Sequence, residues 1–128
     1  MAMMIHGREV HFRRTVWATC EISKLCPGRD LARLAEAMGD NFADNMEVTA
    51  RIAEILSRAD AEARSWEEHN FDAVNMALTA EELMTLDLAE FVSVTTEAMA
   101  AFNRDAETTV EAEPVKKTDG ADSPVPSA

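Results

Sequence analysis

Residues 41–66 carry apolar side chains at the spacing of one long α-helix, and this pattern constrains the fold more than any other feature of the sequence. The apolar stripe consists of Phe42, Met46, Ile52, Ala53, Leu56, Ala59 and Ala63. Charged residues such as Glu47 and Arg51 lie outside the stripe, so the helix is amphipathic and needs other elements to cover its apolar side. The sequence therefore predicts a mainly α-helical fold.

Two shorter helices are expected before this segment. Thr15 can cap a helix over residues 16–26, and the helical pattern ends at Pro27 and the glycine after it. The side chains expected to point inward are those of Trp17, Cys20 and Leu25. Asp30 can cap a second short helix, which Gly39 is placed to end.

Two more helices are expected after the long one. Thr79 and Glu82 match the capping box, in which a threonine begins a helix and a glutamate follows three residues later. This signal predicts a short helix over residues 80–86, and a longer one follows over residues 88–103. The stripe of the longer helix consists of Phe91, Thr95, Met99 and Phe102, with Val92 beside it.

The two ends of the chain differ from this helical centre. Residues 4–6 and 9–13 alternate around a turn that contains Gly7, which predicts a two-stranded β-hairpin whose apolar side consists of Ile5, Val10 and Phe12. Residues 105–128 lack large apolar side chains other than valine, so we expect a disordered acidic tail. The predicted architecture is one domain over residues 1–104, with the hairpin packed on a bundle of four to five helices.

The charge of the chain argues against two classes of partner. Its 24 acidic and 12 basic residues give a formal net charge of -12, which phosphate backbones and anionic membrane surfaces repel. Residues 1–33 differ from the rest, because six basic and three acidic residues give them a net charge of +3. This end could attract an acidic partner or the acidic part of a second copy, although unequal charge along a chain is common without a function.

No catalytic, metal or cofactor site is legible. The only imidazoles are His6, His11 and His69, and no cysteine or carboxylate stands at ligand spacing around them. Nucleophile and phosphate-loop motifs are missing, so we do not expect an enzyme. Cys20 and Cys26 lack the spacing of a redox or zinc motif and are expected to be buried thiols in a reducing cytoplasm, and no apolar run is long enough to span a bilayer.

Protein binding is the function that these features favour. The chain has eight methionines, whose flexible side chains suit surfaces that adapt to a partner, although they could also fill an ordinary helical core. Trp17 and Trp66 lie at the edges of predicted helices, where each could anchor an interface or equally take a place in the core or at its rim. The candidate partner-binding residues at the hairpin and the helix edges are Arg13, Arg14, Trp17 and Trp66.

Four stretches resemble the small tail assembly chaperones of long-tailed phages and prophages. They follow a hairpin with a glycine turn and read TVWA at 15–18, EISKLCPG at 21–28, DL at 30–31 and LTAEELMTL at 78–86. The resemblance covers roughly residues 4–104. It implies a chaperone in the host cytoplasm that coats the tape measure protein, recruits tail tube subunits and is absent from the mature virion.

The family also implies a ribosomal frameshift near the end of the gene, and Lys116 and Lys117 are compatible with a slippery codon pair. Two other functions remain open. The first is a minor structural protein at the head–tail junction, which would stay in the virion. The second is a cytoplasmic regulator that binds a protein or, through the basic N-terminal region, DNA.

Overall fold

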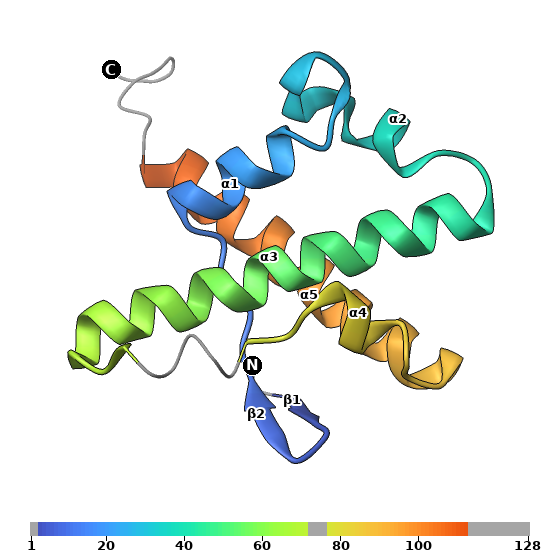
Figure 1. Cartoon of the computed structure of the whole chain (residues 1–128). Coiled ribbons are helices and arrows are strands. Elements are labelled where there is room, and N and C mark those ends of the chain that lie inside the picture. The colour runs from blue at the N-terminus through green and yellow to red at the C-terminus, as the bar shows by residue number, and fades with distance from the viewer. Residues whose placement is uncertain (1–2, 72–76, 113–128) are drawn as a thin grey trace, which may run out of the picture.

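The computed structural model describes residues 3–71 and 77–112, which form an N-terminal hairpin and a group of packed helices (Figure 1). The strands are β1 (Met3–Ile5) and β2 (Arg8–Val10), and the helices are α1 (Val16–Ser23), α2 (Leu34–Met38), α3 (Phe42–Glu68), α4 (Ala80–Leu83) and α5 (Leu88–Ala112). Two 3₁₀ turns, η1 (Pro27–Arg29) and η2 (Leu31–Arg33), connect α1 to α2. The mainly α fold with an N-terminal hairpin is confirmed.

The hairpin is antiparallel, with Met3 opposite Val10 and Ile5 opposite Arg8. Its turn residues have positive φ angles, 50° at His6 and 78° at Gly7, as a tight two-residue turn requires. The predicted apolar side of the hairpin is buried in the main core. Just beyond the hairpin, the backbone N–H of Arg13 donates a hydrogen bond of 3.2 Å to the carbonyl of Leu56, which fixes this segment on α3.

The long helix α3 is the centre of the fold. It packs against α1, α2, α4 and α5, and Figure 1 shows α5 crossing behind it. Asn41 caps its first turn, where the side-chain oxygen accepts the N–H of Asp44. Ile52 and Leu56 have no exposed surface, as the predicted stripe requires, whereas Phe42 at the start of the helix is largely exposed.

Helix α1 differs from its prediction in the side that faces inward. Thr15 caps it as expected, because its hydroxyl accepts the N–H of Ala18. Cys20 is nevertheless exposed and Trp17 is only partly covered, whereas Ala18 and Ile22 are fully buried. The inner side of α1 is therefore formed by positions 18 and 22, which lie one turn apart.

Helix α4 is shorter than predicted and is held by two side-chain hydrogen bonds. The hydroxyl of Thr79 accepts the N–H of Glu82 at 3.1 Å, which confirms the predicted cap. Just before it, the Oγ of Ser57 on α3 accepts the backbone N–H of Leu78 at 3.0 Å, and both residues are buried. This bond satisfies a buried N–H that belongs to neither a helix nor a strand.

Helix α5 begins where expected and buries the predicted residues Phe91, Thr95 and Phe102 against the core. It ends at Ala112, not at residue 103, so the first eight positions assigned to a disordered tail are helical. Alanine and glutamate recur in this stretch, and both favour the helix. The remainder of the predicted tail, residues 113–128, lies outside the described residues.

Candidate partner-binding surface

Arg13 is engaged within the chain. Its Nε donates to Asp60 Oδ1 at 3.3 Å, and its Nη1 donates to Glu67 Oε2 at 3.0 Å. The hydrogen bond to Arg13 lowers the pKa of Glu67, and Arg64 holds the other oxygen of Asp60 at 2.9 Å. Because Asp60 is buried, these two arginines stabilise a charge that would be costly without partners.

Arg14 also binds inside the molecule. Its Nε donates to the hydroxyl of Thr19 at 3.1 Å, and its Nη1 donates to the carbonyl of Phe102 at 3.2 Å. The guanidinium carbon lies 4.0 Å from the centre of the Phe102 ring, which is the geometry of a cation–π contact. Arg14 therefore joins α1 to α5, and its predicted role in partner binding stays a prediction.

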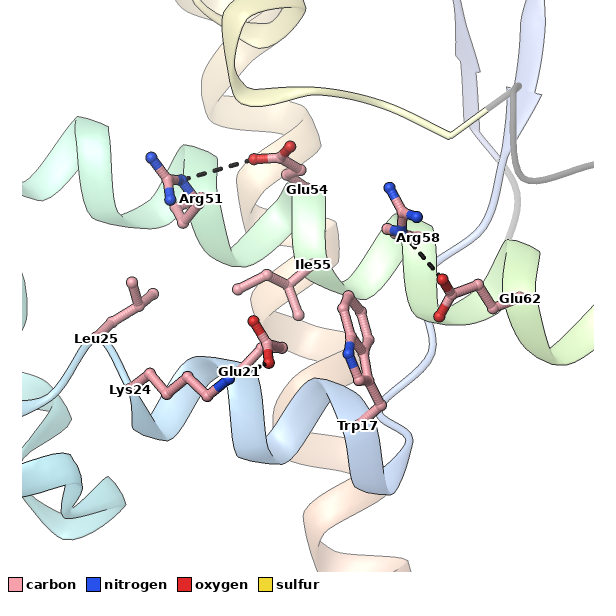
Figure 2. A pocket seen from close by; sticks show the side chains of 9 residues that line it. All are labelled: Trp17, Glu21, Lys24, Leu25, Arg51, Glu54, Ile55, Arg58 and Glu62. Carbon is pink, nitrogen blue, oxygen red and sulfur yellow. Dashed lines mark hydrogen bonds and ion pairs between the residues drawn. The ribbon is translucent and has the colours of Figure 1, made fainter.

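Trp17 lies in an open groove between α1 and α3 that encloses about 520 Å³ (Figure 2). The apolar part of the groove comes from Trp17, Leu25 and Ile55. Its charged side chains pair along each wall of the groove and not across it, namely Lys24 with Glu21 at 2.7 Å, Arg51 with Glu54 at 3.6 Å, and Arg58 with Glu62 at 3.0 Å. The groove therefore presents an indole edge among charges that largely neutralise one another.

Trp66 is the most exposed of the four candidates, with 70% of its surface accessible. It lies near the end of α3, and its ring packs edge-on against Phe71 with the ring centres 5.2 Å apart. Between these two residues, His69 adopts a left-handed conformation (φ 53°) that ends α3 and turns the chain. The structure thus places Trp66 at the surface, next to a second exposed aromatic ring.

A second apolar surface lies at the junction of α4 and α5, and the sequence analysis did not identify it. Met84, Leu88 and Val92 are 53%, 59% and 47% exposed, and we call these three residues the α4–α5 apolar face. Leu88 and Val92 lie one turn apart on the same side of α5. Leu88 and Val92 lie four residues apart beside the predicted stripe of α5, and this spacing was the signal in the sequence that could have revealed the face.

Glu82 links this region to the hairpin. Its carboxylate accepts two hydrogen bonds from Arg8, at 2.6 and 2.9 Å, and lies 2.6 Å from His6 Nδ1. The hydrogen bond from Arg8, opposed by burial, lowers the pKa of Glu82. The side chain of Glu82 therefore joins α4 to the turn and second strand of the hairpin, and does not turn back to the backbone of Thr79 as a capping box would require.

Replacing Glu82 with glutamine should reduce the free energy of unfolding by about 1 kcal/mol at neutral pH, because a partly exposed ion pair with two hydrogen bonds is lost. The folded-state pKa of Glu82 is lowered, so this stabilisation is present above the carboxyl pKa of the unfolded chain and disappears as the pH falls through the folded-state value. Urea unfolding of both proteins at pH 7 and at about pH 3 measures the difference.

The neighbouring Glu81→Gln variant is the matched control, since Glu81 is exposed and its substitution should leave the unfolding midpoint nearly unchanged. Equal losses in the two variants, or a loss at Glu82 that persists at low pH, would contradict the role given to this ion pair.

Further properties bear on the kind of site that is possible. Within residues 3–71 and 77–112, no group of three histidine, cysteine or acidic side chains could hold a metal ion. Over the same residues, no helix is long and apolar enough to cross a membrane. Comparisons with protein-family models, with curated proteins and with solved structures find no match to this chain.

Proposed function

We propose that this protein is a non-catalytic, protein-binding chaperone of phage tail assembly, which coats the tape measure protein and recruits tail tube subunits. The observation that supports protein binding is that large apolar side chains are exposed outside the core, at Trp66 with Phe71 and at the α4–α5 apolar face. The resemblance of residues 4–104 to tail assembly chaperones supports the narrower assignment. The proposed site of action is the host cytoplasm, and the protein is left out of the mature virion.

The physical properties of the chain suit this role. A long array of tape measure helices exposes apolar surface that aggregates before the tail tube encloses it. Many copies of a small domain with a net charge of -12 would cover such a surface and keep the complex soluble through mutual repulsion. Each copy must bind weakly enough for tube subunits to displace it, so the total strength comes from many adjacent sites.

The structure weakens the support for a DNA-binding regulator. That alternative depended on the basic residues of the N-terminal region, and most of these side chains are paired with carboxylates of the same chain. Arg8 binds Glu82, Arg13 binds Asp60 and Glu67, and Arg33 binds Glu36. A side chain held in these pairs contributes little to a continuous positive surface of the kind that binds phosphates.

Co-expression with the tape measure and tail tube proteins of the same phage tests the proposal. We expect the tape measure protein to be soluble only when this chain is present, and an affinity tag on this chain to recover it. Tube protein should displace this chain from the complex, and mass spectrometry of purified virions should not detect it. Failure to recover the tape measure protein would overturn the proposal, and a fixed copy number in virions would favour the head–tail joining alternative.

A further inference from the structure

We propose that the α4–α5 apolar face binds a basic amphipathic helix of the partner protein. The inference rests on the proposed function as a protein-binding chaperone, and it names the surface used and the chemistry of the segment that the surface recognises.

The first argument is that the apolar stripe of α5 is wider than the part that the core covers. One side buries Phe91, Thr95 and Phe102 in the core, as a single amphipathic stripe would. Leu88 and Val92 continue this stripe along one flank, and they are 59% and 47% exposed. A half-exposed flank of an apolar stripe is a surface that a partner could cover.

The spacing of these side chains suits a helix as the partner. Leu88 and Val92 lie one helical turn apart on α5, and Met84 lies at the end of α4, across the short turn that joins the two helices. An amphipathic helix presents its own apolar residues at intervals of three and four, so it can meet such a strip along its length. Methionine adapts to side chains of different shapes, which suits a partner with many related helices.

The charge around the face selects the sign of that helix. Residues 79–103 contain five carboxylates and no lysine or arginine. Glu82 is bound to Arg8, and Glu90 lies on the opposite side of α5 from Leu88 and Val92, but Glu81 and Asp87 are exposed close in sequence to the apolar residues. Lysines or arginines beside a partner's apolar stripe would complement these carboxylates, whereas an anionic membrane or a second copy of this acidic face would be repelled.

The test uses the full chain and two synthetic helical peptides of about 18 residues, long enough to form a helix on binding. Both peptides have the same leucine stripe, flanked by lysines in one and by glutamates in the other. The chain variants are Leu88→Ser with Val92→Ser, and the control Val16→Ser, which makes the same valine-to-serine change at an 83% exposed position on α1. Circular dichroism establishes that each variant is folded, and fluorescence anisotropy gives the Kd.

We expect the lysine peptide to bind the unaltered chain and the Val16→Ser control equally, and to bind the double variant at least about tenfold more weakly. The glutamate peptide should not bind. If the double variant binds the lysine peptide as well as the unaltered chain does, the attraction is general to the acidic surface and the inference is wrong.

The same variants separate this inference from the proposed function. If the double variant still captures the tape measure protein as well as the control does, the chaperone function stands and the surface is wrong. If the lysine peptide distinguishes the variants but no tape measure protein is captured by any of them, the surface stands and the proposed function is wrong.

Discussion

Replacing Leu56 with alanine should lower the free energy of unfolding by about 2–5 kcal/mol, the range observed when a buried leucine is truncated and leaves a cavity. Leu56 has no exposed surface, and it lies on α3, the helix that the other helices contact. Its carbonyl also accepts the N–H of Arg13, so any shift of this part of α3 disturbs the segment between the hairpin and α1. Urea unfolding followed by circular dichroism at 222 nm, a wavelength that reports on helix, measures the loss.

Leu88→Ala is the matched control, because it makes the same chemical change at a position with 59% of its surface exposed. Its unfolding free energy should stay within about 0.5 kcal/mol of the unaltered chain. Similar losses at both positions would show that Leu56 does not occupy the centre of the core.

Replacing Ser57 with alanine should lower the free energy of unfolding by about 1–3 kcal/mol, although alanine is the better helix former. The Ser57 hydroxyl accepts the backbone N–H of Leu78, and the substitution leaves this buried donor without that acceptor. Amide hydrogen exchange provides a second measurement, since the Leu78 N–H should exchange faster in the variant than in the unaltered chain.

Ser65→Ala provides the comparison. Ser65 is as buried as Ser57 and lies on the same helix, but its hydroxyl donates to the carbonyl of Glu62 within α3. Removing the Ser65 hydroxyl leaves no N–H without an acceptor, so we expect the free energy of unfolding to fall by much less than in Ser57→Ala. Equal losses would mean that the bond to Leu78 contributes little and that packing of the serine determines the cost.

The features of the fold that the sequence predicted are those set by neighbouring residues. The stripe of α3, the caps at Thr15 and Thr79 and the glycine turn of the hairpin depend on side chains within a few positions of one another. The inward side of α1 was predicted wrongly because apolar residues occupy several sides of this segment, so only packing against elements distant in sequence decides which side is buried. Ala18 is fully buried, whereas Trp17 remains 38% exposed.

The candidate surface was less predictable for the same reason. Arg13 and Arg14 were chosen as exposed cations, but carboxylates and a ring contributed by α3 and α5 engage them. Predicting the α4–α5 apolar face requires knowing which apolar residues the core leaves uncovered. Only packing distinguishes the covered part of the α5 stripe, which includes Phe91, from its uncovered flank with Val92, because both are apolar in the sequence.

The contacts of the N-terminal segment have a consequence for the order in which a newly made chain can fold. Arg8 binds Glu82, Arg13 binds Asp60 and Glu67, and Arg14 binds the carbonyl of Phe102. Residues 8–14 therefore cannot complete their native contacts until the chain has been synthesised past Phe102. Until then only α3 offers them partners, at Leu56, Asp60 and Glu67, and because a two-stranded hairpin is marginal by itself, this segment reaches its native place late although it is synthesised before its partners.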